Sequence, residues 1–226
     1  AGAILPALTT TRSIARVSDP LLIRPPGALI EDDFLERCVR CGECMKVCIG
    51  NALHPTFLEA GTEGMFSPKL IARTGYCEFN CTLCGQVCPT GAIQRISIEE
   101  KNGRGEYEAQ GPVKLGTAFY DHGRCLPWAM ETPCVVCEEV CPTSPKAIYS
   151  REVTIRKRDG KNITLRRPYV DPALCIGCGI CEHECPVKDH AAIRVTAIGE
   201  TRSPERRLLM DGGDPSNLLD LGTRDR

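Results

Sequence analysis

The stretch CIGCGICEHECPV, residues 175–187, places four cysteines within thirteen residues and a proline directly after the last of them. Its spacing is C-x2-C-x2-C-x3-C-P. This run is the bacterial ferredoxin signature for ligation of a 4Fe–4S cluster. The stretch therefore predicts an iron–sulfur site and a fold built around it.

Three related stretches occur elsewhere in the chain of 226 residues. Motif one is CVRCGECMKVC (38–48), motif two is CEFNCTLCGQVCP (77–89), motif three is CLPWAMETPCVVCEEVCP (125–142), and motif four is the stretch quoted above. Together they contain all 16 cysteines of the chain: Cys38, Cys41, Cys44, Cys48, Cys77, Cys81, Cys84, Cys88, Cys125, Cys134, Cys137, Cys141, Cys175, Cys178, Cys181 and Cys185. At four cysteines per cluster, they predict four 4Fe–4S clusters with no thiol left over.

Disulfides and structural zinc are the two alternative uses of so many cysteines. Disulfides suit small secreted domains, but cysteines two residues apart in repeated triplets make poor disulfide partners for one another. Structural zinc sites usually combine two C-x2-C pairs per metal, whereas these motifs have a triplet and a distant fourth cysteine. Iron–sulfur clusters are therefore the leading prediction.

The composition agrees with a cofactor that takes part in the core. Net charge is -1, so bulk charge indicates neither a nucleic acid nor an anionic lipid partner. Aromatic residues make up only 5% of the chain, which is few for an ordinary apolar core. We expect the clusters to act as core and the protein without them to fold poorly. The chain has no Gly-rich phosphate loop, nucleotide fingerprint or nucleophile motif, so we predict that it is not itself an enzyme.

Strand-like runs precede three of the motifs, and apolar tails follow all four. The preceding runs are PKLIARTGY before Cys77, VKLGTAFYD before Cys125 and RRPYVDPAL before Cys175. We expect a short helix to begin at each fourth cysteine, because the proline that follows three of them suits a first helical turn. An apolar strand should follow each such helix. These elements predict an α+β fold of two fused ferredoxin-like units, rich in loops.

Two other segments have local signals of their own. EDDFLER, residues 31–37, predicts a helical turn before motif one, with acidic residues at its start. VTIRKRDGKNITLRR, residues 153–167, alternates around Asp159-Gly160 and predicts a β-hairpin. Its basic residues either dock an acidic partner or form a solvated face.

The ends of the chain differ from the middle. We place the four-cluster body at residues 31–198. Residues 1–30 form an N-terminal arm whose apolar start is too short to cross a bilayer. It fits the remnant of an export signal or the end of a membrane anchor, with a frayed arm as the plainer interpretation. Residues 199–226 form a polar C-terminal tail, either disordered or laid over a partner.

A few single residues are candidates for tuning or shielding the clusters. Arg37, Arg40 and Lys46 around motif one would favour the reduced, more anionic cluster. Trp128, the only tryptophan, either shields a cluster from water or simply packs its loop. The four histidines are not needed as ligands: His54, His122, His183 and His190.

The chain resembles a known family. Residues 24–48 and 175–195, together with the wide gap between Cys125 and Cys134, are similar to ferredoxin-type four-cluster proteins of periplasmic nitrate reductase and methylamine-utilisation systems. The resemblance covers residues 24–195. It implies electron transfer at the periplasmic face of the membrane, with a cytoplasmic membrane-associated location as the alternative. It also implies a peripheral subunit of a hetero-oligomeric complex, whose partners are a membrane quinol-linked subunit, a cytochrome or a catalytic oxidoreductase subunit.

The leading functional hypothesis is a relay of single electrons through four clusters between redox partners. One alternative is an iron–sulfur reductase with a substrate-binding cluster, which needs an iron with an open position and hence a site of three cysteines. The other is a redox maturation or assembly factor, whose clusters should be labile to chelators.

The grouping of the cysteines depends on how the motifs pair, because in two-cluster ferredoxins the fourth cysteine of one motif binds the cluster of the other. Spacing leaves two schemes open: neighbour pairing (one with two, three with four) and nested pairing (two with three, one with four). Motif one lacks a leading strand and a proline after Cys48, and the subunits that the family resembles nest their motifs. We therefore predict nested pairing, with these sets: Cys38, Cys41, Cys44 and Cys185; Cys77, Cys81, Cys84 and Cys141; Cys125, Cys134, Cys137 and Cys88; Cys175, Cys178, Cys181 and Cys48.

Overall fold

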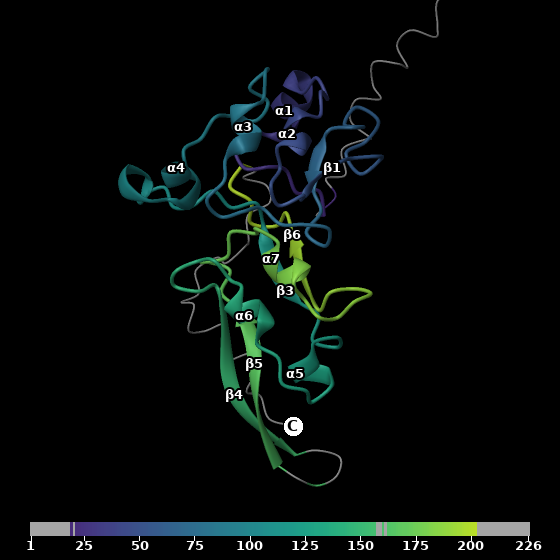
Figure 1. Ribbon diagram of the computed structural model, residues 1–226, viewed down its shortest axis with the longest axis vertical. Helices are drawn as coiled ribbons and strands as arrows, with labels where there is room; N and C mark the ends of the chain where they lie inside the picture. The colour runs from purple at the N-terminus through teal and green to yellow at the C-terminus, as the bar shows by residue number, and fades with distance from the viewer. Residues whose placement is uncertain (1–18, 20, 157–159, 161, 203–226) are drawn as a thin grey trace, which may run out of the picture.

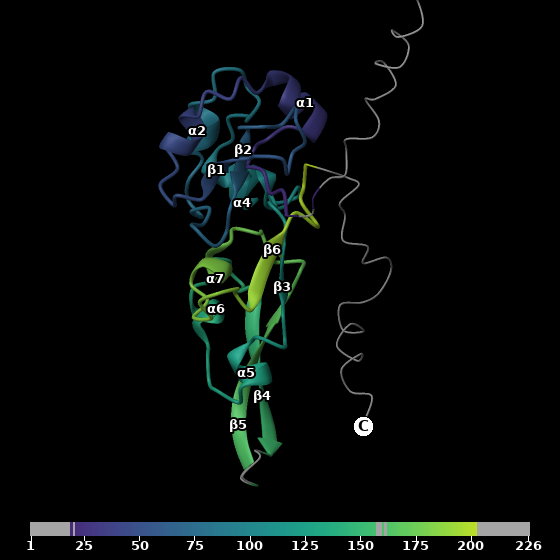
Figure 2. The same ribbon diagram turned by 90° about the vertical axis from the view of Figure 1, so that its right-hand side faces the viewer.

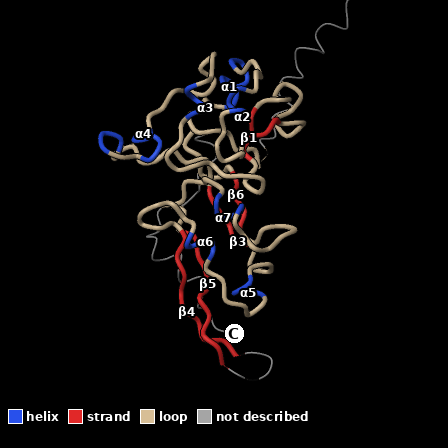
Figure 3. The backbone as a smooth tube through the Cα atoms, viewed as in Figure 1, coloured by secondary structure: helices blue, strands red, loops and turns tan. Residues whose placement is uncertain are grey.

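The structure is a computed structural model that describes residues 19, 21–156, 160 and 162–202. Its elements are α1 (Glu31–Arg37), α2 (Glu43–Lys46), β1 (Leu53–Pro55), β2 (Pro68–Leu70), α3 (Leu83–Gln86), α4 (Ile98–Asn102), the 3-10 turn η3 (Gly105–Tyr107), β3 (Thr117–Tyr120), α5 (Leu126–Ala129), α6 (Val136–Glu139), β4 (Ile148–Arg156), β5 (Asn162–Val170), α7 (Ile180–His183) and β6 (Ile193–Thr196). Most of the described chain lies in loops and turns (Figure 3). No helix in these ranges has the length and apolar character needed to cross a membrane.

The described chain forms two halves, stacked along the long axis of the molecule (Figure 1, Figure 2). The first half contains motifs one and two and the elements from α1 to η3. The second contains motifs three and four and the elements from β3 to β6. This mixed, loop-rich arrangement of helices and strands fits two ferredoxin-like units, as predicted.

Strand pairing in the first half joins the segments around motif one to the segments around motif two. β1, which follows motif one, pairs antiparallel with β2, which precedes motif two, and Leu53 lies opposite Leu70. An isolated bridge between Ala28 and Ile93 joins the segment before motif one to the tail of motif two. No strand precedes motif one in the described residues, as predicted, and this isolated bridge takes its place.

The second half repeats this scheme with longer strands. β4 follows motif three and pairs antiparallel with β5, which precedes motif four, so that Ile148 lies opposite Val170. β3 precedes motif three and pairs with β6, which follows motif four, so that Tyr120 lies opposite Ile193. In both halves the two segments between the motifs pair with each other, and the segment before the first motif pairs with the segment after the second.

The predicted hairpin is confirmed by the β4–β5 ladder, which runs from Ile148↔Val170 to Arg156↔Asn162. The turn that we predicted at Asp159-Gly160 is not tested, because residues 157–159 and 161 lie outside the described residues. The strands predicted before motifs two, three and four, and the helix before motif one, are also confirmed.

The prediction that each fourth cysteine begins a helix is wrong. The short helices α2, α3, α6 and α7 each contain the third cysteine of a motif and end before the fourth. In a helix the N–H of Ala52 would bond the carbonyl of Cys48; here it donates to the Cys48 sulfur at 3.3 Å. Ile93 and Ala192 donate in the same way to Cys88 and Cys185, both at 3.4 Å. At these three fourth cysteines the sulfur accepts a backbone N–H from the tail that follows, and no helix begins there.

The body extends further along the chain than residues 31–198. Leu22, Ile23 and Arg24 are buried, although we assigned them to the arm. Arg24 forms an ion pair with Glu31 at the start of α1, and Arg202 reaches the same carboxylate from the predicted tail. Both boundaries are therefore corrected outward. The rest of the predicted arm and tail, residues 1–18 and 203–226, lies outside the described residues.

Motif four holds the two halves together. The half-buried Arg73, which lies between β2 and motif two, donates hydrogen bonds to five carbonyl oxygens around the end of α7: Glu182, His183, Cys185, Val187 and Lys188. Gly179, directly before α7, lies close to Ala72 of the first half, because a Cβ built on Gly179 would lie 2.9 Å from the Ala72 Cβ. Its φ of 88° also favours glycine.

Candidate iron–sulfur centres

Four of the cavities formed by the described residues are each lined by four cysteines. We number them I to IV: site I has Cys38, Cys41, Cys44 and Cys88; site II has Cys48, Cys77, Cys81 and Cys84; site III has Cys141, Cys175, Cys178 and Cys181; site IV has Cys125, Cys134, Cys137 and Cys185. The space not filled by protein atoms, part of it open to solvent, ranges from about 320 Å³ at site III to about 370 Å³ at site II. All 16 cysteines are used once.

These sets correct the nested pairing that we predicted. The first three cysteines of each motif stay together as expected, but the fourth cysteine comes from the neighbouring motif in every case. Site I takes Cys88 and not Cys185; site II takes Cys48 and not Cys141; site III takes Cys141 and not Cys48; site IV takes Cys185 and not Cys88. Strand pairing is the physical reason, because the β1–β2 ladder draws motif one onto motif two and the β4–β5 hairpin draws motif three onto motif four.

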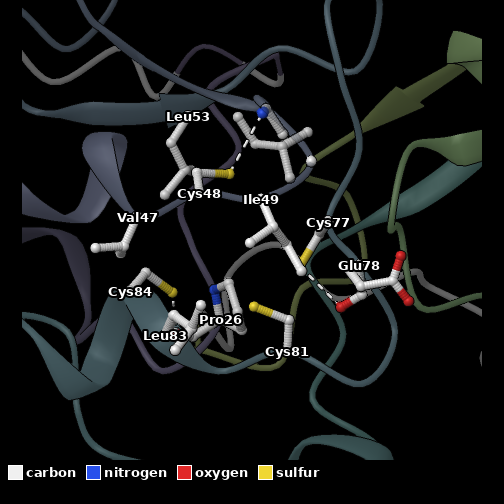
Figure 4. Close-up of a pocket in the computed structure, with 13 residues that line it drawn as sticks. Pro26, Val47, Cys48, Ile49, Leu53, Cys77, Glu78, Cys81, Leu83 and Cys84 are labelled. Carbon is white, nitrogen blue, oxygen red and sulfur yellow. Dashed lines mark hydrogen bonds between the residues drawn. The ribbon is translucent and has the colours of Figure 1, made fainter.

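Site II shows the common geometry (Figure 4). The side chains of Cys48, Cys77, Cys81 and Cys84 are directed toward a shared space. Most of the other lining residues are apolar, among them Pro26, Val47, Ile49, Leu53, Leu70 and Leu83, and Glu78 also lines the cavity. The cavity therefore offers sulfur donors inside a mostly apolar wall.

Positive backbone φ angles let the cysteine loops wrap each cavity. Gly42 and Gly179, the residues before α2 and α7, have φ of 76° and 88°. Between the first two cysteines of motif four, Gly177 has φ of 69°, and Arg40 takes the matching position in motif one with φ of 57°. Glycine adopts this conformation without strain, whereas arginine does so at some cost.

Several of the thiols are poor anions in the protein alone, although at Cys88 hydrogen bonds outweigh burial and lower the pKa. Burial is the first cause, and nearby thiols add to it: the pKa is raised to about 12 for Cys44, Cys84, Cys125 and Cys178. Iron binding offsets this cost, because iron–sulfur clusters are held by thiolates. In the described ranges no three or more His, Cys, Asp or Glu side chains are spaced to hold a single metal ion. The four sulfurs surround a cavity instead, and this donor set fits a 4Fe–4S cluster.

Sequence reasoning missed two side chains that contact cysteine sulfurs. Lys101 in α4 lies 3.3 Å from the Cys77 sulfur through its Nζ, and the Tyr120 hydroxyl lies 2.8 Å from the Cys137 sulfur. Lys101 is 24 residues from Cys77, so no local motif marks it. Tyr120 precedes motif three in a predicted strand, and only the register of β3 shows that it faces site IV.

The residues predicted to tune or shield clusters differ in where they lie. Lys46 pairs with Glu43 on the surface, whereas Arg40 lines site I and also donates to the carbonyl of Glu63. The Trp128 ring stacks on the His122 ring, with 4.0 Å between the ring centroids, and Trp128 does not line site IV. None of the four histidines, which are all described, lines any of the four cavities.

Within each half, neighbouring sites lie close enough for their thiols to interact. Burial is the main reason that the pKa of Cys84 in site II is raised to about 12, and Cys77 and Cys44 add to it. Cys44 belongs to site I. Burial likewise raises the pKa of Cys181 in site III, and Cys137 of site IV is among the thiols that add to it. Sites I and II are therefore neighbours, and so are sites III and IV.

Between the halves, sites II and III are neighbours. The backbone N–H of Cys77 donates to the carbonyl of Cys178 at 2.8 Å. One peptide hydrogen bond thus joins a cysteine of site II to a cysteine of site III. The four sites follow one another in the order I, II, III, IV along the molecule.

Comparison with known proteins identifies the repeated unit. The family model for the 4Fe-4S dicluster domain matches residues 37–92 and again residues 132–188. The first match spans motifs one and two, and the second spans most of motif three and all of motif four. Two clusters in each unit give four in total, as predicted, and this division agrees with the neighbour grouping of the cysteines.

Curated relatives cover most of the chain. The methylamine utilization ferredoxin-type protein MauM of Methylorubrum extorquens is 38% identical over 193 residues, which are 84% of this chain and 79% of the relative. MauM of Paracoccus denitrificans is 35% identical, over 86% of this chain and 78% of the relative. The ferredoxin-type protein NapG of Escherichia coli is 34% identical, over 85% of this chain and 77% of the relative. No solved structure matches. With two dicluster units and relatives of this similarity, the chain belongs to the 4Fe–4S dicluster family, among ferredoxin-type proteins of the MauM and NapG kind.

Proposed function

We propose that the protein relays single electrons along sites I to IV between two redox partners that dock at opposite ends of the molecule. The clusters supply one-electron exchange when they are bound. The chain supplies the order of the sites, their separation and their apolar walls. The ferredoxin-type relatives and the two dicluster units support this proposal.

The hydrogen bond from Cys77 to Cys178 is the observation that carries the proposal. Two separate ferredoxin units would leave sites II and III without a direct link. Here the backbone of one site contacts the backbone of the other, and Arg73 fixes motif four beside motif two. The two middle sites, II and III, are therefore in direct contact through the backbone.

The cysteines of the four sites differ in how exposed they are to solvent. Cys41 in site I is exposed, and its neighbour Val39 is 60% exposed. At the other end Cys134 in site IV is half-buried. In site III, by contrast, Cys175, Cys178 and Cys181 are all buried, and only Cys141 is half-buried. Site I is thus the most accessible of the four sites and site III the least, which favours electron exchange with a partner at site I and insulation at site III.

The cysteine count in each site weighs against the enzyme alternative. A cluster that binds substrate needs an iron without a protein ligand, and each cavity here presents four sulfurs. The buried sulfurs and apolar walls also favour retained clusters over the labile clusters of an assembly factor. We therefore propose a subunit without catalytic chemistry of its own.

The cellular setting is part of the proposal and rests on the family resemblance. We expect the protein to lie at the periplasmic face of the membrane, peripheral to it, in a complex with redox proteins. Fractionation of cells that produce the native protein tests this expectation. Recovery of the holoprotein as a free monomer in the cytosol would contradict it.

Metal analysis and a reductive titration of the anaerobically purified holoprotein test the relay. We expect about 16 iron and about 16 acid-labile sulfide atoms per chain, and uptake of about four electrons. The EPR signals of reduced clusters should broaden as neighbours become reduced, because adjacent sites interact magnetically. Zinc in place of iron, about eight iron atoms in the fully loaded chain, or four signals without mutual broadening would overturn the proposal.

A further inference from the structure

Lys101 is a buried lysine that lies against site II. It belongs to α4, which follows motif two and begins at Ser97, whose hydroxyl accepts the N–H of Glu100. The Lys101 residue is only 4% exposed. Its Nζ donates to the Cys77 sulfur at 3.3 Å, to the carbonyl of Glu78 at 2.6 Å and to the carbonyl of Cys81 at 2.8 Å. All three hydrogens of the ammonium group are thus used.

No carboxylate balances this charge. None of the ion pairs among the described residues includes Lys101. A buried cation without an opposite charge is costly, and carbonyl dipoles alone compensate it only in part. The anionic group that the four cysteines of site II hold is the partner that this geometry leaves for Lys101.

At the other three sites no described Lys or Arg side chain donates to a cysteine sulfur, although Arg40 lines site I. In the part of the chain that the structure describes, Lys101 is the only Lys or Arg whose side chain donates to a cysteine sulfur. Site IV has a neutral donor, the Tyr120 hydroxyl. Lys114 lies near site III but donates to the carbonyls of Pro172 and Ala173. The four sites therefore differ in fixed charge at the sulfur.

We propose that Lys101 makes site II the most readily reduced of the four sites, so that electrons collect at the second position of the line. Reduction adds one negative charge to the group in the site, and a fixed ammonium 3.3 Å from a ligand sulfur stabilises the more negative form. The inference rests on the proposed function, since it assigns a reduction potential to a site of the relay. Lys101 acts on the cluster through Cys77 and is a positioning and tuning residue.

The main test is a redox titration of the holoprotein, monitored by EPR, in the wild type and in Lys101→Met. We expect one of the four reduction equilibria, the most favourable one, to become less favourable by about tenfold, which is about 59 mV for a one-electron couple. The other three should stay in place. Lys101→Arg keeps the charge and should recover at least part of the shift.

Lys146→Met is the matched control. Lys146 Nζ donates to the carbonyl of Glu138 at 2.6 Å, directly after Cys137, just as Lys101 donates to that of Glu78 after Cys77. Lys146 is exposed and contacts no sulfur. This variant should shift no equilibrium by more than about twofold. Four unchanged equilibria in Lys101→Met, or a uniform shift in both variants, would overturn the proposal.

A measurement on the native protein covers the case in which Lys101→Met loses its cluster. The holoprotein is produced with lysine labelled with nitrogen-15 at Nζ and reduced by one electron. Its EPR signal should show hyperfine coupling to the label, because Lys101 touches a ligand of the site reduced first. Coupling that is absent at this stage and arises only on further reduction would disprove the proposal. The proposed function fails separately, through a low iron content.

Discussion

Arg24 shows how a charged residue serves the core of a small protein. Its guanidinium is fully buried, donates to the Ser67 hydroxyl at 2.8 Å and to the carbonyl of Pro68 at 2.7 Å, and lies over the Phe34 ring. Glu31 supplies the opposite charge. Burial alone would raise the pKa of Glu31, but the hydrogen bonds and charges of Arg24 and Arg202 outweigh it and lower the pKa.

Glu31→Gln should destabilise the holoprotein by about 3 kcal/mol, the low end for a broken buried pair, because Glu31 is partly exposed. A carboxylate whose pKa is lower in the folded state stabilises the fold above its unfolded pKa, and this stability is lost as pH falls through the folded pKa. The wild type should thus lose its advantage over the variant below the ordinary pKa of 4.5. The measurement is the denaturant midpoint for loss of visible absorbance against pH.

Glu36→Gln is the control for this prediction, since Glu36 is exposed on the same helix. It should change the free energy of unfolding by less than about 0.5 kcal/mol. An equal loss of stability in both variants, or a Glu31→Gln effect that persists unchanged at low pH, would contradict the assignment.

Tyr120→Phe tests the neutral hydrogen bond at site IV. The half-buried hydroxyl lies 2.8 Å from the Cys137 sulfur and donates to it when the sulfur is a thiolate ligand. Loss of one such bond, worth about 1 kcal/mol, should make one reduction equilibrium about fivefold less favourable. The affected EPR signal should differ from the signal that responds to Lys101→Met. A change in the same signal would show that site IV is misassigned.

At the scale of the elements, strand pairing decides which cysteines meet. The sequence predicted the strands before motifs two, three and four, and it predicted the hairpin between motifs three and four. That hairpin already favours neighbour pairing, because an antiparallel ladder from Ile148↔Val170 brings the end of motif three to the start of motif four. Our preference for nested pairing rested on the lack of a leading strand and of a proline at motif one and on the family resemblance, and the strand pairing outweighs all three.

Other parts of the site depend on contacts that sequence patterns do not contain. The bridge between Ala28 and Ile93 joins segments 65 residues apart and has no alternating pattern. The helices that carry the third cysteines have only four residues each, too few for a helical period to be visible. The contact of Lys101 with Cys77 likewise depends on the path of the chain after motif two.

Serine substitutions of fourth cysteines test the grouping in solution. Cys48→Ser should alter the same EPR signal as Lys101→Met, because Cys48 and Cys77 share site II. Cys141→Ser should alter a different signal, that of site III. Nested pairing gives the opposite result, with Cys141→Ser and Lys101→Met acting on one signal. Iron content of each variant shows whether the altered cluster is retained.

At the scale of the whole molecule, the two halves act as one body because motif four packs on the first half. Arg73 of the first half donates to five carbonyls of motif four and the residues after it. At Gly179, Ala72 lies so close that no side chain would fit. The line of sites depends on this interface, since sites II and III come from different halves. The described molecule is elongated along the same direction (Figure 1, Figure 2).

Arg73→Gln should weaken the contact between the halves. Loss of the charged hydrogen bonds should destabilise the protein by about 2–3 kcal/mol. It should also reduce the magnetic broadening between the signals of sites II and III, while the pairs within each half keep theirs. Arg95→Gln, at an exposed position, is the control and should leave both properties unchanged. Loss of broadening within a half would contradict the proposed interface.

The most direct test of the account is a crystal structure of the holoprotein with anomalous scattering measured at the iron edge. We predict four iron clusters in a line, in the order I, II, III, IV, with Cys48 bound to the cluster of Cys77 and Cys141 bound to that of Cys178. The Lys101 ammonium should contact the second cluster in the line. Iron bonds from Cys141 to the cluster of Cys77, or four clusters that do not form a continuous line, would contradict the account.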